Sequence, residues 1–163
     1  MLLAPVGNLA VVPTASADSP DAARRILAGI LPNVYRAFEF RDESQAYDRL
    51  ALSITGDTLT EIYLKHQRAL EMAERGGARA RVEAVEVGDV ASVEPRSGGG
   101  FDARATWQVG GTVTHFGHRH FRQNRYDARV TVVPVEERWK ICASARPFYI
   151  INSHLRFVII RFR

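Results

Sequence analysis

Three of the five histidines in this 163-residue chain lie within six positions, at residues 115, 118 and 120. Neutral imidazoles are ligands for zinc, copper and nickel. A two-residue turn at Phe116-Gly117 would place His115 opposite His118 on strands about 5 Å apart, with His120 one two-residue step further along the same face. This spacing would allow a transition-metal site formed by His115, His118 and His120, without an obvious acidic fourth ligand. Imidazoles that hydrogen-bond their neighbours are favoured over this metal site, and a histidine that moves a proton is a further alternative.

Further candidate residues share the apolar face of the same hairpin. Trp107 and Tyr126 are predicted to lie opposite each other, where core packing is favoured over a platform for a ligand. Arg122 is on that face too, and a buried guanidinium needs a carboxylate partner or an anionic ligand. Tyr63 and His66, on a predicted helix, could close a pocket from the other side, although a hydrogen-bonded core position is favoured for His66. The predicted pocket residues are Tyr63, His66, Trp107, His115, His118, His120, Arg122, Asn124 and Tyr126.

Two amphipathic strands position these residues. Apolar and polar residues alternate over residues 101–109 and again over 125–133, which is the period of strands with one buried face. A turn at Phe116-Gly117 puts both apolar sets on the same face, although Phe-Gly is not a preferred dipeptide for such a turn. Gly110-Gly111 predicts a bulge or bend within the hairpin. A turn at these two glycines ranks second, because it would give a poorer core.

Helices are predicted before any strand. Ser19-Pro20 is typical of the cap and first residue of a helix, which continues at helical spacing to about Phe40. Pro32 should kink this helix or split it in two. Asp42 can cap a second, shorter helix with Tyr47 in its buried stripe.

After a third predicted helix, the spacing of apolar residues changes from that of a helix to that of a strand. Asp57 or Thr58 can cap this helix, and Gly76-Gly77 can end it. From Ala78 the alternation is that of a strand, with a slip of phase that indicates a bulge. A turn near Pro134 leads to another core strand. The order of elements is therefore helices first and strands afterwards.

The two ends differ in composition from the middle of the chain. Residues 1–20 are apolar and contain Ala15-Ser16-Ala17, which has the form of a signal-peptidase site, but they lack a basic start and are broken by proline and glycine. A flexible leader or linker is therefore favoured over a secretory signal, and the run is too short to span a membrane. Residues 21–147 are predicted to form one domain. Residues 148–163 mix isoleucine with arginine, which indicates a last strand or, alternatively, a basic tail near a membrane or partner.

Composition narrows the classes of function. A net charge of +4, 46% hydrophobic residues and 25% charged residues are ordinary for a globular domain of this size. The basic residues are scattered outside the C-terminal end, so no nucleic-acid-binding stripe is predicted. Cys142 is the single cysteine, which excludes an intrachain disulfide and a cysteine-based metal site. A compartment outside the cytoplasmic membrane, such as the periplasm, is slightly favoured over the cytoplasm.

Helices followed by a long, bent antiparallel sheet with a tryptophan-bearing strand resemble the nuclear transport factor 2-like superfamily, which includes ketosteroid isomerase and SnoaL-type cyclases. The resemblance covers about Asp21 to Ala145 and suggests an uncharacterised bacterial envelope branch. It implies an α+β fold, a cystatin-like cone in which N-terminal helices pack in the concave face of a curved antiparallel sheet. It also implies a pocket at the wide end and, often, a homodimer formed through the outer sheet face. The strings that carry it are Val34-Tyr35-Arg36-Ala37-Phe38, Ala46-Tyr47-Asp48-Arg49-Leu50 and Trp139-Lys140-Ile141.

Enzymes of that superfamily place a carboxylate base and an oxyanion donor pair in an apolar cavity. Glu83, Asp102 and Asp127 all have outward parity here, although Asp42, Asp48 or Asp57 from the predicted helices could still reach a pocket. The catalytic residues therefore stay unknown. This favours a non-catalytic binding or assembly domain of an envelope-associated bacterial protein, with a small molecule or a protein as partner and no cofactor. One alternative is a domain that binds a divalent transition metal through the three histidines. The other is a cofactor-free lyase or isomerase in which a histidine or Tyr63 moves a proton.

Overall fold

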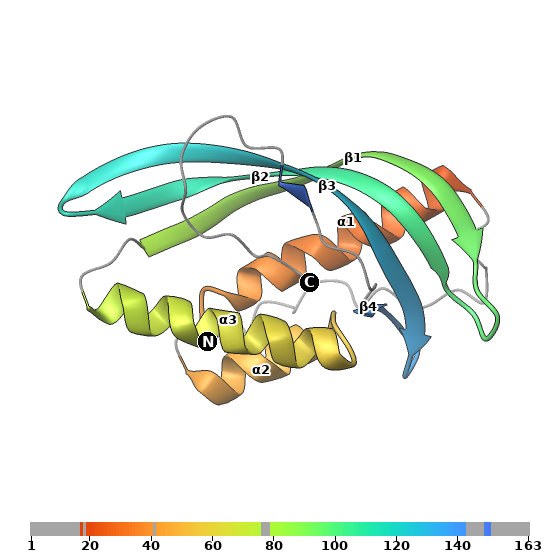
Figure 1. Ribbon diagram of the computed structural model, residues 1–163, viewed down its shortest axis with the longest axis horizontal. Coiled ribbons are helices and arrows are strands. Elements are labelled where there is room, and N and C mark those ends of the chain that lie inside the picture. The colour runs from red at the N-terminus through yellow and green to blue at the C-terminus, as the bar shows by residue number, and fades with distance from the viewer. Residues whose placement is uncertain (1–16, 18, 41, 76–78, 143–148, 151–163) are drawn as a thin grey trace, which may run out of the picture.

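The chain forms an α+β fold in which three helices pack against an antiparallel sheet (Figure 1). The computed structural model describes residues 17, 19–40, 42–75, 79–142 and 149–150. The predicted fold class is confirmed. The predicted leader and most of the predicted tail lie outside the described residues. The elements are α1 (Pro20–Ala37), α2 (Glu43–Ala51), α3 (Asp57–Glu74), β1 (Arg79–Pro95), β2 (Phe101–His115), β3 (His118–Val135), β4 (Arg138–Cys142) and β5 (Tyr149–Ile150).

The helices begin where the capping residues predict. The Ser19 hydroxyl accepts a hydrogen bond from the Ala22 N–H at 3.2 Å, and the Asp42 carboxylate accepts one from the Gln45 N–H at 3.0 Å. α1 continues through Pro32 as one helix, which excludes the split and leaves the predicted kink as the remaining alternative. None of the three described helices is long and apolar enough to cross a membrane.

The buried stripe of α2 differs from the prediction at Tyr47. This side chain is 41% exposed, whereas Ala46 and Leu50 are fully buried. The helix is short, and its buried face is set by these two positions, four residues apart. The Tyr47 ring instead packs edge-on against Tyr63 of α3, with ring centroids 5.3 Å apart. The tyrosine therefore joins two helices outside the core.

The sheet is a meander in the order β1-β2-β3-β4, with β5 paired to β3. The β2–β3 pairing runs without interruption from Phe101 opposite Val132 to His115 opposite His118. Phe116 and Gly117 form the turn with φ angles of 45° and 78°, which is the signature of a primed two-residue turn. The predicted turn is confirmed, and the alternative turn at the two mid-strand glycines is wrong.

Gly110 and Gly111 of β2 accommodate an irregularity in the neighbouring strand β1. The register shifts lie in the β1–β2 pairing, one of them between Val82 and Ala84 opposite these glycines. The predicted phase slip in β1 is thus confirmed. No bulge interrupts the β2–β3 pairing, but both strands of the hairpin curve, as the predicted bend requires (Figure 1). A Cβ atom on Gly111 would lie 2.2 Å from the Arg81 carbonyl oxygen. The glycines permit the bulged strand to approach β2 closely.

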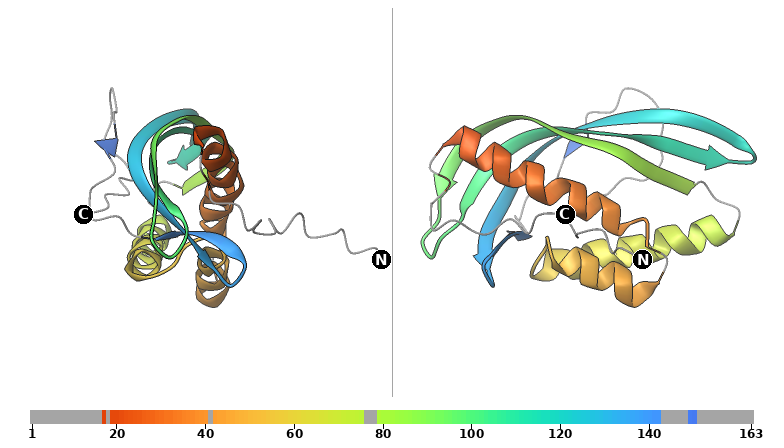
Figure 2. Two further views of the ribbon diagram at one scale, coloured as in Figure 1. Left: turned by 90° about the vertical axis from the view of Figure 1, so that its right-hand side faces the viewer. Right: turned by 180° about the vertical axis from the view of Figure 1, so that it is seen from behind.

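The core lies between the helices and the concave face of the sheet, which curls around them in the end-on view of Figure 2. The apolar residues of the predicted alternation all point inward. These are Phe101, Ala103, Ala105, Trp107 and Val109 on β2, and Tyr126, Ala128, Val130 and Val132 on β3. The parity derived from the sequence is therefore confirmed on both strands.

β4 joins the sheet to the helical layer. On one side it pairs with β3, and on the other Ile141 forms a parallel bridge with Ile54, in the segment between α2 and α3. The Ile141 N–H donates to the Ser53 carbonyl at 2.8 Å, and the Thr55 N–H donates to the Ile141 carbonyl at 2.9 Å. Segments from opposite halves of the chain are thereby held together by backbone hydrogen bonds.

The convex face of the sheet carries ion pairs. Arg104 binds both carboxylate oxygens of Asp127, at 2.8 and 2.9 Å, and Arg96 binds Asp102 at 2.8 Å. Hydrogen bonding to Arg104 lowers the pKa of Asp127 below its ordinary value. This charged face is the surface through which the superfamily resemblance implies dimerisation.

Candidate functional site

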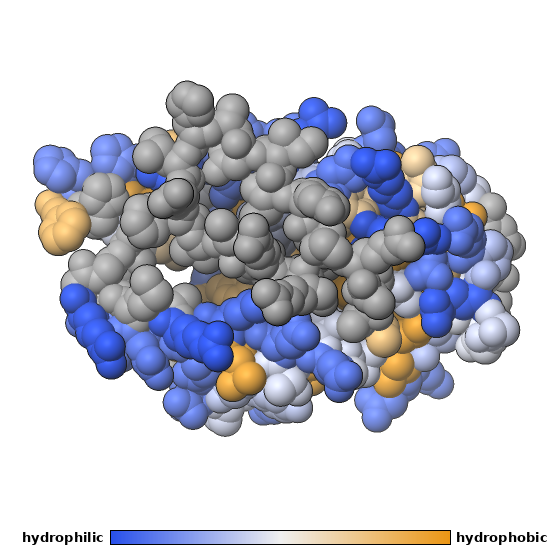
Figure 3. Space-filling model, viewed as in Figure 1, coloured by the Kyte–Doolittle hydropathy of each residue, from blue (hydrophilic) through white to orange (hydrophobic). Residues whose placement is uncertain are grey.

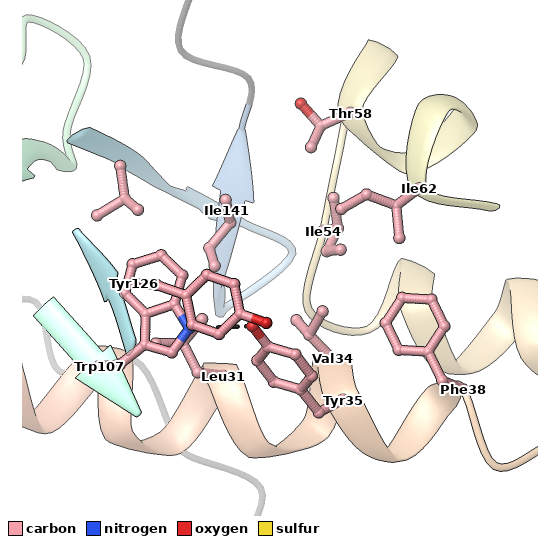
Figure 4. Close-up of a pocket in the computed structure, with 11 residues that line it drawn as sticks. Leu31, Val34, Tyr35, Phe38, Ile54, Thr58, Ile62, Trp107, Tyr126 and Ile141 are labelled. Carbon is pink, nitrogen blue, oxygen red and sulfur yellow. Dashed lines mark hydrogen bonds between the residues drawn. The ribbon is translucent and has the colours of Figure 1, made fainter. Parts of the chain in front are cut away.

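A small cavity of about 40 Å³ lies where α1, α3 and the concave face of the sheet meet (Figure 4). This volume exceeds that of one water molecule and is far below the roughly 300–1,000 Å³ of a site for a drug-sized ligand. Its walls are formed mainly by aliphatic and aromatic side chains from both halves of the chain. The lining residues are Leu31, Val34, Tyr35, Phe38, Ile54, Thr58, Ile62, Trp107, Tyr126, Val130 and Ile141.

A chain of hydrogen bonds forms the polar part of one wall. The Trp107 indole N–H donates to the Tyr35 hydroxyl oxygen at 3.0 Å. Because indole nitrogen can only donate, the hydroxyl of Tyr35 keeps its own hydrogen for Tyr126, to which it is also bonded. Tyr126 is bonded in turn to Asn124. Tyr126 also stacks on Trp107, with ring centroids 5.3 Å apart and planes at 13°.

Burial determines the charge state of the two tyrosines. Loss of water raises the pKa of Tyr35 far above its ordinary range, and the neighbouring Tyr126 raises it further. Burial is also the first cause that raises the pKa of Tyr126. Both hydroxyls therefore stay neutral at physiological pH. They can donate or accept hydrogen bonds, and they are poorly suited to act as bases.

One lining residue, Thr58, has a polar group without a hydrogen-bond partner among the described residues. Its hydroxyl oxygen, at the start of α3, is buried. A buried hydroxyl without a partner costs about 1–3 kcal/mol, so such groups in native proteins are usually satisfied by water or a ligand. Figure 4 shows this oxygen turned away from the other labelled lining residues, so Thr58 presents its methyl group to the cavity.

Tyr63 and His66, two of the predicted pocket residues, do not line this cavity. The Tyr63 hydroxyl accepts a hydrogen bond from the Gln67 amide at 2.9 Å. His66 is 3% exposed, and its Nε2 lies 3.0 Å from the Phe40 carbonyl oxygen, which requires a hydrogen on that nitrogen. Its ring also contacts Phe38 edge-on. His66 therefore occupies the hydrogen-bonded core position that the sequence favours.

The predicted histidine group lies at the tip of the β2–β3 hairpin, away from the cavity. His118 and His120 are exposed, and their rings lie face to face with centroids 6.5 Å apart. The backbone of His115 pairs with His118, while its side chain is outside the described residues. No group of three metal-binding side chains occurs among the residues that are described. The metal site stays a prediction.

Arg122 and Asn124 lie between the tip and the cavity. Both are half-buried on the concave face of β3, as their parity predicts. Within the described part of the chain, Arg122 forms no ion pair, so the carboxylate partner expected from the sequence is not among these residues. Of the nine predicted pocket residues, Trp107 and Tyr126 line the cavity, and Asn124 reaches it through its bond to Tyr126.

Sequence reasoning expected helical residues in the pocket but did not identify those that line it. Tyr35, Phe38 and Thr58 all line the cavity. Tyr35 and Phe38 follow the helical spacing of the buried stripe of α1, which indicates a core position but not a neighbour. A tyrosine hydroxyl facing the core requires a polar partner, and this requirement was the available signal for a contact with Trp107 or Tyr126.

Comparisons with known proteins identify a similar solved structure but no related family. No family model matches the chain, and no curated protein matches its sequence. Among solved structures, it is similar to the intermembrane space region of the chloroplast protein ARC6, with 18% sequence identity and a TM-score of 0.48. The alignment covers 83% of this chain and 98% of that one. This similarity says nothing about what either protein binds.

Proposed function

We propose that this chain is a non-catalytic binding domain of the nuclear transport factor 2-like kind, and that its cavity receives a small apolar group of a ligand or partner. The observation that carries the proposal is the lining of the cavity. It joins aliphatic walls, the methyl group of Thr58 and two neutral tyrosine hydroxyls that are already hydrogen-bonded. Such a site suits an alkyl group.

The same lining argues against acid-base catalysis within the cavity. General acid-base chemistry requires a group that gains and loses a proton near neutral pH. The eleven lining residues that the structure describes include no carboxylate and no histidine, and burial raises the pKa of both tyrosines. Binding is therefore the function that this chemistry supports best.

The size of the cavity restricts what can enter. About 40 Å³ admits one small group, such as the branched end of an alkyl chain or a short aliphatic side chain, and the rest of the ligand must lie outside. A protein partner that inserts one such side chain would fit this restriction, as would a small branched molecule.

The proposed compartment is the periplasm or another space outside the cytoplasmic membrane.

A titration with 2-methylpropan-1-ol, followed by NMR, tests the proposal. We expect saturable shifts of the methyl signals of lining residues such as Val34, Ile62 and Ile141. Val130→Leu adds one methylene to the cavity wall and should weaken binding severalfold. Val87→Leu makes the same change on β1 outside the cavity and should leave binding unchanged.

A further variant tests the polar contribution. Thr58→Val removes the hydroxyl and keeps the shape of the side chain, so it should leave binding of the alcohol unchanged, because the oxygen faces away from the cavity. Shifts that do not saturate, or that spread evenly over the surface of the wild-type protein, would show that the cavity does not bind small apolar groups. Equal binding by wild type and Val130→Leu would do the same.

A further inference from the structure

The tip of the β2–β3 hairpin, residues 114–122, combines exposed aromatic rings with positive charge. Phe116 is 87% exposed at the turn itself, and Phe121 is 66% exposed five residues later. The same nine positions contain two arginines and three histidines, and no aspartate or glutamate. The tip lies at one end of the long axis of the described part of the molecule (Figure 1). Figure 3 shows an apolar spot at that end, with hydrophilic side chains beside it.

The turn conformation is costly for phenylalanine. Phe116 has a φ angle of 45°, in the left-handed region, which bulky residues adopt rarely. Asparagine or aspartate before glycine is the common choice for a turn of this type. An exposed phenylalanine at this position is explained neither by burial nor by conformational preference. Residues that are held in unfavourable conformations are often there for a function.

We propose that this tip docks on the surface of an anionic lipid bilayer, with Phe116 inserted among the headgroups. Aromatic side chains are enriched at the boundary between headgroups and hydrocarbon, and each nearby arginine adds attraction to anionic lipids. The headgroup layer is roughly 5–8 Å thick. Arg119 lies two residues beyond the turn, about 7 Å along the strand, so its guanidinium reaches the phosphates when Phe116 is inserted.

The surroundings of the tip fit this orientation. Arg119 is exposed and Arg122 is half-buried, and the parity of β3 places them on opposite faces of the hairpin. Positive charge therefore borders the phenylalanine on both faces. The nearest acidic residue on β1 is Glu83, which is hydrogen-bonded to Thr112 behind the tip. Phe121 lies across Gly110 on the convex face.

Vesicle flotation with the full chain tests this proposal. Wild type should bind vesicles that contain phosphatidylglycerol at least tenfold more tightly than vesicles of phosphatidylcholine alone. Phe116→Asn should reduce binding about tenfold, because one aromatic side chain no longer leaves water. Asn-Gly is a preferred sequence for this turn, so this variant keeps the hairpin and separates loss of binding from loss of folding. Arg119→Gln together with Arg122→Gln should reduce binding about 25-fold, at about fivefold for each arginine.

Control variants remove an exposed apolar side chain or two exposed positive charges elsewhere. Leu64→Ser removes an exposed apolar side chain of α3, and Arg24→Gln with Arg25→Gln removes two exposed charges of α1. Neither should change binding. Phe116→Trp should show a blue shift of its emission on anionic vesicles, against a background of two native tryptophans that are buried already.

Three results would overturn the proposal. The first is a wild-type protein that does not bind phosphatidylglycerol vesicles. The second is a tip variant that binds as tightly as its control, which would assign vesicle binding to another part of the chain. The third is tight binding to heparin that is unaffected by Phe116→Asn, since this would show a site for soluble polyanions with no role for insertion.

Discussion

Replacing Tyr35 by phenylalanine tests the hydrogen-bonded wall of the cavity. The substitution removes the oxygen that accepts the Trp107 indole N–H at 3.0 Å and that is bonded to Tyr126. Tyr35 is 9% exposed and Trp107 is 3% exposed, so water cannot readily replace the lost hydroxyl. A buried donor without an acceptor costs about 1–3 kcal/mol. For a domain of this size, that corresponds to a fall in Tm of about 3–9 °C.

Urea denaturation followed by circular dichroism measures this change. Tyr47→Phe is the matched control, because Tyr47 is 41% exposed and its substitution should alter the free energy of unfolding by less than about 0.5 kcal/mol. If Tyr35→Phe is as harmless as the control, the hydrogen bond to Trp107 does not stabilise the folded state, and the reasoning about the cavity wall is wrong.

The same variant has a signature at alkaline pH. Unfolding moves Tyr35 from a raised pKa to an ordinary value near 10, so above about pH 10 the unfolded state releases a proton that the folded state retains. The free energy of unfolding of the wild type should therefore fall as pH rises above 10. Each such tyrosine contributes a slope of about 1.4 kcal/mol per pH unit. Tyr35→Phe should show a shallower fall, and an unchanged slope would refute the raised pKa.

Three further outcomes are expected. Gly111→Ala should destabilise the protein by about 1–3 kcal/mol, because its Cβ would lie 2.2 Å from a carbonyl oxygen of β1. Gly29→Ala in α1, where the Cβ meets no atom within 4 Å, should stabilise the protein by about 0.5–1 kcal/mol. Thermal denaturation of the two variants measures this difference. Asp127 has a pKa below its ordinary 3.8 in the folded state, so its stabilising effect is present above that pH and is lost as pH falls through the folded-state pKa; Asp127→Asn should flatten the acid limb of a stability curve. Calorimetric titration with zinc, copper and nickel tests the metal-binding alternative: tight stoichiometric binding that disappears in His115→Ala/His118→Ala would support it, and no binding by the wild type would exclude it.

The central hairpin was predictable because local and long-range signals agree. Alternation fixes the inward face of each strand, and a two-residue turn at Phe116-Gly117 is the connection that puts both inward faces on one side. Trp107 therefore had to lie opposite Tyr126. The caps of α1 and α2 were predictable for a related reason, since Ser19 and Asp42 act on backbone groups three residues away.

The cavity was not predictable from these signals. It is lined by Tyr35, Thr58 and Trp107, which come from three distant segments of the chain. The periodicity within one segment does not predict how distant segments pack against each other. For a related reason, the two mid-strand glycines did not indicate which strand carries the bulge. A local rule assigns the irregularity to the strand that contains the glycine, whereas Gly111 accommodates an irregularity in the neighbouring strand.

The bridge between Ile54 and Ile141 has a consequence for folding. The bridge that ties the segment between α2 and α3 to the sheet cannot form until β4 is in place, and it joins residues that are far apart in sequence. Folding should accordingly be slow for a chain of this size. The amides of Thr55 and Ile141 are both used in this closure, and their hydrogen exchange should report opening of the whole molecule, whereas amides near the hairpin tip should exchange through local fraying.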